Sequence, residues 1–396
     1  MRILIAVCNF PPEPNVMASL PYDLATALAE HHDVTVLAPH PSRPAGYDFS
    51  NCPPVKGKFN LIRVKTSIYT ASRIVGRSKE GISLGKSVAR FIQNHHDEYD
   101  VLYMMVSPYF AEYYITKAAV KYHLPLVRHI QDVFPEPIVR RIPVFGKLVF
   151  KLALPIDKFI CRHSTRIICI GDRIKNYVSR TRKTDEKKMY VVMNWQDESR
   201  FKEHIPYDTS RSVFTYMFLG NLSSAANLHY LLRCYAESGA KDTRLVIAGT
   251  GNIKDSLIEL AGGYPNAQIV FRDAPSAEVN KIQSEADVLL LPLRKSIALR
   301  CNPSKLPAYM FSHRAILACV ESGSDVDCTI KAADCGWVVE PDDDSALKKM
   351  FKELPSVSQE ELERKGENGY MYSQLHLTKN VNLQCLMDVI TGINRE

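Results

Sequence analysis

The basic turn that follows residues 287–293 is the part of the chain best suited to chemistry. The run DVLLLPL is continuously apolar, which is typical of a parallel strand buried on both faces. After it come the cations Arg300 and Lys305, and Ser304 can cap the helix that begins beside them. A helix N-terminus attracts anions through its backbone N–H groups, and Lys305 adds a full charge. The turn could therefore hold a diphosphate, although an ordinary solvated basic loop would have the same composition.

A second group of candidate residues follows residues 126–130, which the apolar pattern predicts as another buried strand. The segment RHIQDVFPEP carries His129, Asp132 and Glu136 at the carboxyl end of that strand. Ligands in open parallel sheets bind at this edge, so these side chains are candidates for acid–base chemistry or for contacting an acceptor. The alternative is structural: His129 would point into the core, and Asp132 would cap a turn.

Two glycine-containing turns follow further predicted strands. The sequence FLGNLSSAAN contains Gly220 and Asn221, and LVIAGTGN contains Gly249 and Gly251. Glycine lets a backbone come close to a ligand, but any tight turn between a strand and a helix uses it equally. The first turn of the chain, NFPPEPN, lacks the G-x-G-x-x-G fingerprint. A hydride-transferring dehydrogenase is therefore not expected.

These residues need parallel sheets to bring them to one edge, and the chain is patterned to form two such sheets. Apolar runs alternate with helical segments, which predicts doubly wound α/β domains, and the polar segment 194–212 is predicted to link the two halves. Strands are expected at residues 3–7, 34–38, 61–64, 101–106, 126–130, 166–170, 189–193, 213–219, 245–248, 269–271, 287–293, 316–320 and 337–340. Helices are expected at residues 18–30, 83–94, 172–180, 228–238, 276–286 and 380–393, and after Pro108, Ser304 and Asp344.

Composition limits the partners of the chain. The 396 residues carry a net charge of +7, which favours anionic partners such as phosphates or an acidic membrane surface. No Lys/Arg block with interleaved aromatic residues is present, so nucleic acid is not an expected partner. The 10 cysteines are scattered without zinc-finger spacing, which predicts a reduced, cytosolic protein without a metal site.

One segment is a candidate for membrane contact. No apolar run approaches the roughly 18 residues that a transmembrane helix needs, so a soluble or peripheral protein is expected. Residues 142–160 combine apolar residues with Lys147, Lys151 and Lys158, and Pro155 interrupts the pattern. Such a stretch is either a helix packed on the sheet or a surface in contact with lipid headgroups.

The order of the motifs along the chain resembles that of one enzyme family. FPPEPN, IQDVFPE, FLGNLSSAAN, LVIAGTGN, ADVLLLPL and NPSKLPAYM follow one another as in the retaining glycosyltransferases of family four, which have the GT-B fold. The similarity is to bacterial transferases that assemble O-antigen, capsule and colanic acid, such as the WbuB-like fucosamine transferases. The resemblance implies an α/β protein with two Rossmann-like doubly wound domains that face each other across a cleft.

The resemblance also implies a division of the chain into domains. Residues 1–196 would form the acceptor-binding domain, residues 197–212 the linker, and residues 213–375 the nucleotide-sugar-binding domain. The last segment, residues 376–396, would be a helix that packs back on the N-terminal domain.

Carried over to this sequence, the family pattern assigns a role to each candidate residue. Lys305 would bind the diphosphate, Asp132 and Glu136 would face the acceptor, and Asp132 or His129 would assist or orient it. The residues expected around the donor nucleotide sugar are Asn15, Gly220, Asn221, Gly249, Gly251, Arg300, Ser304 and Lys305. Arg300 is included for its charge, and neither a metal nor a cofactor is expected.

One departure from the family pattern concerns two glutamates that flank the basic turn, because the matching positions here are Arg300 and Ala308. Loss of a carboxylate removes a bidentate partner for the ribose hydroxyls. The expected reaction is transfer of a sugar from a UDP- or GDP-sugar to a lipid-linked surface polysaccharide or O-antigen acceptor. It would take place in the cytoplasm or peripherally at the cytoplasmic face of the inner membrane. The alternatives are a nucleotide-sugar epimerase of the same fold and a non-catalytic nucleotide-sugar-binding relative.

Overall fold

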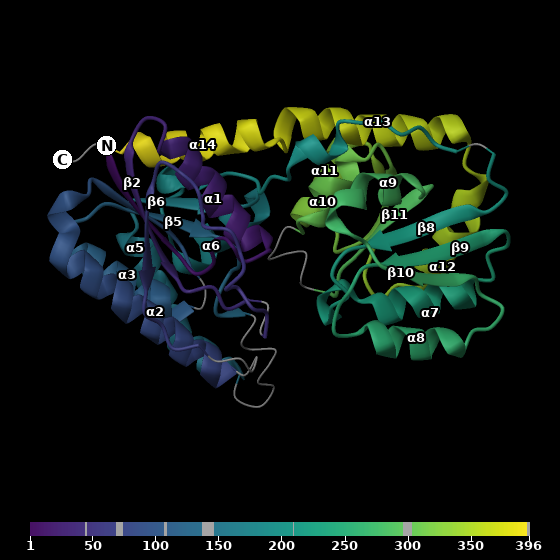
Figure 1. The fold of residues 1–396 in the computed structure, drawn as a ribbon. Helices are drawn as coiled ribbons and strands as arrows, with labels where there is room; N and C mark the ends of the chain where they lie inside the picture. The colour runs from purple at the N-terminus through teal and green to yellow at the C-terminus, as the bar shows by residue number, and fades with distance from the viewer. Residues whose placement is uncertain are drawn as a thin grey trace. The chain divides into compact units, whose positions relative to one another are not determined.

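A computed structural model describes residues 1–43, 46–68, 74–106, 109–136, 146–208, 210–295 and 303–393 of the chain. The chain forms two compact units (Figure 1). Unit 1 comprises Met1–Met193 and Asn382–Glu396, and unit 2 comprises Asn194–Val381.

Unit 1 is built on a seven-stranded sheet in the order β3-β2-β1-β4-β5-β6-β7, in which every pairing is parallel. The central strands β1 and β4 are continuous apolar runs that are buried on both faces, as the sequence predicted, and the neighbouring β5 is buried although it carries Arg128 and His129. The chain order reverses between β1 and β4, so the turns after these strands flank a switch point. The strands are β1 (Arg2–Val7), β2 (Asp33–Pro39), β3 (Asn60–Val64), β4 (Val101–Met105), β5 (Leu126–Ile130), β6 (Arg166–Cys169) and β7 (Met189–Val191).

The helices of unit 1 connect these strands, and one of them begins earlier than predicted. The helix expected at residues 83–94 begins nine residues earlier, at Ile74. Pro155 interrupts the apolar pattern of residues 142–160, but one helix, Gly146–His163, runs through that residue. The helices are α1 (Val16–Leu28), α2 (Ile74–His95), α3 (Tyr109–Lys121), α5 (Gly146–His163), α6 (Asp172–Arg182) and α14 (Lys379–Thr391).

Helix α14 packs on unit 1 although it comes from the end of the chain. The Arg166 guanidinium donates to the carbonyl oxygens of Val389 at 2.8 Å and Gly392 at 2.6 Å. The Met193 N–H donates to Asn382 Oδ1 at 3.1 Å. Residues from about 382 onward are therefore part of unit 1.

Unit 2 is built on a six-stranded parallel sheet in the order β10-β9-β8-β11-β12-β13. The order reverses between β8 and β11, which places a second switch point at the carboxyl ends of these two strands. The strands are β8 (Phe214–Leu219), β9 (Thr243–Ala248), β10 (Ile269–Arg272), β11 (Val288–Pro292), β12 (Ala315–Cys319) and β13 (Gly336–Val339).

Helices cover both faces of this sheet (Figure 1). Helices α7, α8 and α12 pack on the face that holds the main core, and α10 contacts α13 on the other face. The sequence did not predict α13, and the helix expected at residues 276–286 is shorter. The helices are α7 (Leu228–Ser238), α8 (Lys254–Gly262), α9 (Val279–Ser284), α10 (Lys305–Phe311), α11 (Asp325–Ala333), α12 (Asp344–Glu353) and α13 (Gln359–His376). Two parallel, doubly wound α/β sheets confirm the predicted fold class.

Candidate functional site

Two turns that contain glycine lie side by side at the carboxyl ends of the neighbouring strands β8 and β9 in unit 2. Gly220 follows β8 with φ +142°, and Gly249 follows β9 with φ +131°. The Gly220 N–H donates to the Ala248 carbonyl oxygen at 2.9 Å, and a Cβ on Gly249 would lie 2.1 Å from the Gly220 carbonyl oxygen. At Gly249 neither the space nor the backbone angle admits a side chain, and at Gly220 the backbone angle disfavours every residue except glycine. The sequence left two explanations for these glycines, a ligand site or an ordinary tight turn. Close packing of the two turns on each other is sufficient to explain them.

Gly251 and Asn221 complete these turns. A Cβ on Gly251 would lie 2.1 Å from the Leu222 carbonyl oxygen, so this glycine also permits close backbone packing. The Leu222 N–H donates to the Thr250 carbonyl oxygen at 2.8 Å, which ties the turn after β8 to the turn after β9. Asn221 is exposed to solvent beside Gly220. The four predicted residues of these two turns are thus brought together.

Lys305 packs directly on the turn after β8. A Cβ on Gly220 would lie 2.3 Å from Lys305 Cε and 3.1 Å from Lys305 Nζ, and the ammonium group lies 5.1 Å from the centre of the Phe218 ring. In the described part of the chain no carboxylate forms an ion pair with this ammonium group, and burial lowers the pKa of Lys305. A half-buried cation without a counter-ion, beside glycine backbone, is suited to binding an anion.

Helix α10 fixes the position of Lys305. The Tyr309 hydroxyl accepts from the Leu219 N–H at 3.0 Å and donates to the Leu219 carbonyl oxygen at 3.1 Å, which joins α10 to the end of β8. Gln196 Nε2 donates to the Ser304 carbonyl oxygen at 2.8 Å. Because Tyr309 is fully buried, the first turn of α10 cannot shift without breaking this pair of bonds.

The predicted cap by Ser304 is wrong. Ser304 occupies the N-cap position, but its side chain makes no capping hydrogen bond. Its backbone is already helical, with φ −60° and ψ −10°, whereas a capping side chain needs the extended backbone of an ordinary N-cap. Arg300, the other cation predicted for this turn, lies outside the described residues.

The turn after β12 adds a carboxylate that the sequence reading passed over. Glu321 is buried at the carboxyl end of this strand, which is the neighbour of β11. The turn is held by Ser322, whose N–H donates to Glu340 Oε1 at 2.8 Å, and by Gly323, whose N–H donates to Asp327 Oδ2 at 2.7 Å. An acidic residue directly after the apolar run ILACV was the available signal in the sequence. Ala308, at the position of one family glutamate, is buried in α10.

The first turn of unit 1 places Asn15 at the start of α1. Asn15 Oδ1 accepts from the Ala18 N–H at 2.9 Å, so it caps the helix. The turn is held by the buried carboxylate of Glu13, which accepts from the Ser42 N–H at 2.8 Å and the Arg43 N–H at 2.9 Å. The sequence reading did not single out Glu13, although an acidic residue between prolines was visible. Contact of Asn15 with donor phosphates stays a prediction.

His129 lies in the core of unit 1. Its Nδ1 is 2.6 Å from the Tyr103 hydroxyl and its Nε2 is 3.1 Å from Gln131 Nε2. Burial lowers the pKa of His129 to about 3, so the ring is uncharged near neutral pH. A base this weak is poorly matched to taking a proton from a hydroxyl group. The geometry therefore favours the structural alternative for His129.

Glu136 does not fit the acceptor role that the resemblance implied. Its carboxylate accepts from Arg182 Nη1 at 2.7 Å, Arg182 Nη2 at 2.9 Å and the Tyr177 hydroxyl at 2.8 Å, and it is almost fully buried. These bonds occupy both oxygens. Asp132, four residues earlier, is exposed at the carboxyl end of β5. Desolvation by the surrounding protein nevertheless raises the pKa of the Asp132 carboxyl group. Asp132 remains the predicted acceptor contact.

A chain of buried ion pairs holds the Asp132 loop. Arg128 Nη2 lies 2.5 Å from Glu112 Oε2 and 2.7 Å from Asp157 Oδ1, and Arg182 Nε lies 2.6 Å from Asp157 Oδ2. Arg182 Nη2 also donates to the Phe134 carbonyl oxygen at 2.5 Å. The network therefore joins β5, α3, α5 and α6 to the loop. Burial is the main cause that raises the pKa of Glu112 to about 7.

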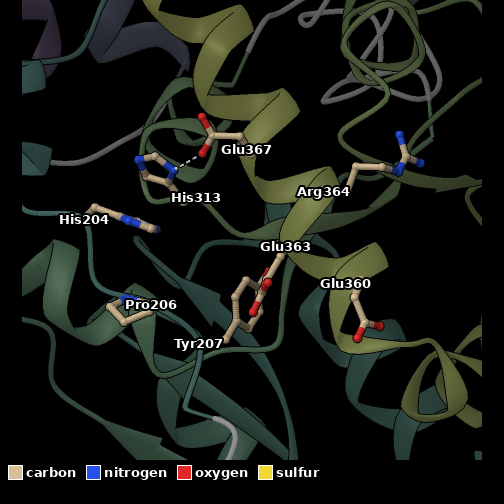
Figure 2. A pocket seen from close by; sticks show the side chains of 8 residues that line it. All are labelled: His204, Pro206, Tyr207, His313, Glu360, Glu363, Arg364 and Glu367. Carbon is tan, nitrogen blue, oxygen red and sulfur yellow. Dashed lines mark hydrogen bonds and ion pairs between the residues drawn. The ribbon is translucent and has the colours of Figure 1, made fainter.

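A separate pocket of about 460 Å³ lies in unit 2 at the amino end of β12 (Figure 2). The His204 and His313 rings are 4.3 Å apart, and His313 Nδ1 lies 3.0 Å from Glu367 Oε2. The residues that line this pocket are His204, Pro206, Tyr207, His313, Glu360, Glu363, Arg364 and Glu367. The pocket lies at the other end of α10 from Lys305, so it is not the predicted donor site.

No group of three or more His, Cys, Asp or Glu side chains in the described ranges is arranged to hold a metal ion. Among the helices that are described, none combines the length and the apolar character needed to cross a membrane.

Comparison with known proteins gives two family matches. Residues 17–200 match the family described as Glycosyltransferase Family 4, and residues 213–355 match the family described as Glycosyl transferases group 1. A curated relative, the probable glycosyltransferase WbjE of Pseudomonas aeruginosa, is 24% identical over 237 residues, which are 57% of this chain. The match spans only 58% of that relative.

Solved structures resemble the whole chain at low identity. HepE from Anabaena in complex with UDP has a TM-score of 0.68 at 13% identity, with 99% of this chain and 100% of that chain covered. WaaG, a glycosyltransferase involved in lipopolysaccharide biosynthesis, has a TM-score of 0.68 at 16% identity and the same coverage. Sucrose-phosphate synthase from Thermosynechococcus elongatus reaches a TM-score of 0.74 at 11% identity, with 98% of each chain covered. These likenesses show the GT-B fold.

Proposed function

Because the chain belongs to glycosyltransferase family 4, we propose that it transfers a sugar from a nucleotide diphosphate donor to an acceptor hydroxyl group, with retention at the anomeric carbon. The observation that carries the proposal is the packing of Lys305 on Gly220. The ammonium group has no carboxylate partner in the described part of the chain, and it adjoins backbone that glycine leaves open. A diphosphate can supply the missing negative charge.

A uridine diphosphate sugar is the donor that we favour, with a guanosine diphosphate sugar as the alternative. The support is that HepE, which shares the fold, has been solved with UDP and with UDP-glucose. The base would bind in unit 2, near the turns after β9 and β12. Glu321 is a carboxylate in that region which could accept from the ribose hydroxyls in place of the family glutamate that Ala308 replaces.

The reaction breaks the bond between the anomeric carbon and the diphosphate oxygen. Lys305 stabilises the charge that develops on the leaving diphosphate. Arg300 adds a second cation, because it belongs to the same basic turn in the sequence. The acceptor hydroxyl attacks the anomeric carbon from the side on which the diphosphate leaves and passes its proton to a diphosphate oxygen. Asp132 orients the acceptor hydroxyl through a hydrogen bond. No metal is needed for these steps.

The acceptor we propose is a lipid-linked intermediate of a surface polysaccharide or O-antigen. The support is the likeness to WaaG, a glycosyltransferase involved in lipopolysaccharide biosynthesis, and to the probable glycosyltransferase WbjE. Such an acceptor would be met at the cytoplasmic face of the inner membrane, where the protein would bind peripherally. The narrower likeness to the WbuB-like transferases stays a prediction.

The test begins with binding. A thermal-shift panel of UDP, GDP, ADP and their common sugars should show that one uridine or guanosine compound raises the melting temperature, because a ligand of the folded state stabilises it. Release of the nucleotide is then measured with and without a lipid-linked acceptor. Release that depends on the acceptor supports the transferase, whereas conversion of the donor into an isomeric nucleotide sugar, without release of nucleotide, would indicate the epimerase.

A binding-only relative is the second candidate, and one observation favours it. Ala308 is buried where the family often has a glutamate, so a carboxylate of the donor site is missing. This candidate predicts a thermal shift with a nucleotide diphosphate but no turnover. Restoring the carboxylate with Ala308→Glu would then be expected to tighten donor binding.

A further inference from the structure

A basic depression of about 650 Å³ lies in unit 1 at the amino end of its sheet. It adjoins the C-terminal ends of α5 and α6, close to the starts of β6 and β7. Four of its lining cations are Lys158, Arg162, Lys183 and Lys188, and Asp185 is the one acid among the described residues that line it. The predicted acceptor contact, Asp132, follows the carboxyl end of β5, so the depression is at the opposite edge of the sheet.

Helix ends explain only part of this positive charge. The C-terminus of a helix attracts cations, and Lys188 Nζ donates to three carbonyl oxygens at the end of α5, at 2.7, 3.0 and 3.0 Å. Lys188 therefore already satisfies that helix end. Within the described ranges, no carboxylate pairs with Lys158, Arg162 or Lys183. Three cations without counter-ions around one depression indicate an anionic ligand.

The same helix exposes a row of apolar side chains that leads into the depression. Leu148 is 55% exposed and Leu152 is 67% exposed, one helical turn apart. Pro155 is also exposed, and it lines the depression. Lys147 and Lys151 are exposed beside the two leucines. Neighbouring exposed leucines flanked by lysines are the pattern of a helix that lies in the headgroup region of a membrane.

We propose that α5 docks on the surface of an anionic bilayer. Leu148 and Leu152 enter the boundary between headgroups and acyl chains, and the basic depression binds the phosphate of a lipid headgroup. An anionic lipid fits because both parts of the surface carry basic side chains next to apolar area. The inference rests on the proposed function in one respect, since it supplies the surface on which a lipid-linked acceptor would be met.

The test is sedimentation of the full chain with vesicles, without donor or acceptor. Wild type should bind vesicles of phosphatidylglycerol and phosphatidylcholine at least tenfold more tightly than vesicles of phosphatidylcholine alone. Two variants should each lose this preference by about tenfold: Leu148→Ala with Leu152→Ala, and Lys158→Glu with Arg162→Glu and Lys183→Glu. The matched control is Lys202→Glu with Lys241→Glu and Lys352→Glu, which changes the net charge equally on exposed residues of unit 2. This control should bind like wild type.

Three results would overturn the inference. One is binding at the wild-type level by the variant Lys158→Glu with Arg162→Glu and Lys183→Glu. Another is an equal loss of binding in the matched control, because general electrostatic attraction would then explain the binding. Stabilisation by inorganic phosphate alone, without any vesicle binding, would show a soluble anion instead of a lipid. A thermal shift with UDP, measured on the same samples, keeps the two proposals apart. If wild type fails to bind vesicles but keeps the UDP shift, the docking surface is refuted and the proposed function is not.

Discussion

The ammonium-bearing side chain of Lys305 occupies the space that a Cβ on Gly220 would need, with Lys305 Cε only 2.3 Å from that position. These residues are 85 positions apart in the chain, one after β8 and one at the start of α10. Their contact joins the two turns that flank the switch point of unit 2. Lys305 thereby becomes part of the turn after β8.

Lys305→Ala should lower the rate of sugar transfer by about 100- to 1000-fold, because it removes the charge that stabilises the leaving diphosphate. The shift in melting temperature with the nucleotide diphosphate should also shrink. The matched control is Lys352→Ala, on an exposed position of α12. Transfer at the wild-type rate by Lys305→Ala would remove this lysine from the mechanism.

Gly220→Ala should weaken donor binding, because its methyl group would displace Lys305. It should also reduce the free energy of unfolding by about 1–3 kcal/mol, because alanine is strained at φ +142°. Gly239→Ala is the control: Gly239 has φ +69° but nothing within 4 Å of the added Cβ. Both variants should lose stability in chemical denaturation, and only Gly220→Ala should lose donor affinity. Equal donor affinity in the two variants would contradict the contact.

Asp132 and Glu136 lie in one motif but should respond differently to loss of charge. Asp132→Asn should lower kcat by about 100-fold while the free energy of unfolding stays within about 0.5 kcal/mol of wild type. Glu136→Gln should destabilise unit 1 by about 3 kcal/mol, since it leaves Arg182 buried without one of its carboxylates. Chemical denaturation together with steady-state kinetics separates the two effects. A stable but inactive Glu136→Gln would restore the acceptor role to that residue.

Glu112 should make the stability of the protein depend on pH. Burial raises the pKa of Glu112 to about 7 in the folded chain, against 4.5 in its ordinary state. The protonated carboxyl group therefore contributes stability that is fully present below pH 4.5 and is lost as the pH rises through about 7. Glu112→Gln stays neutral, so it should flatten this fall by an amount on the order of 2–3 kcal/mol.

The measurement for Glu112 is the free energy of unfolding from pH 4.5 to pH 8. Glu278→Gln, on an exposed residue of unit 2, serves as the control and should follow the wild-type curve. Parallel curves for wild type and Glu112→Gln would show that Arg128 keeps the Glu112 carboxylate charged across the whole range.

The sequence by itself determined the strands of both sheets and the turns at their carboxyl ends. Runs such as residues 101–106 and 287–293 are apolar without alternation, and only a strand covered on both faces buries every side chain of such a run. A parallel sheet then brings the turns after these strands to one edge. The glycines of the turns after β8 and β9 could be named for the same reason, because their positions followed from the ends of the strands.

Tertiary structure alone decided which polar residues at that edge are available to a ligand. Glu136 is engaged by Arg182, a residue 46 positions later, and nothing local in IQDVFPEP distinguishes it from the exposed Asp132. His129 is neutral because Tyr103 and the core surround it, and Lys305 lacks a counter-ion because no carboxylate from the described strands reaches it. Charge state and availability depend on neighbours that are distant in the chain, whereas burial in a strand is written into the local pattern of side chains.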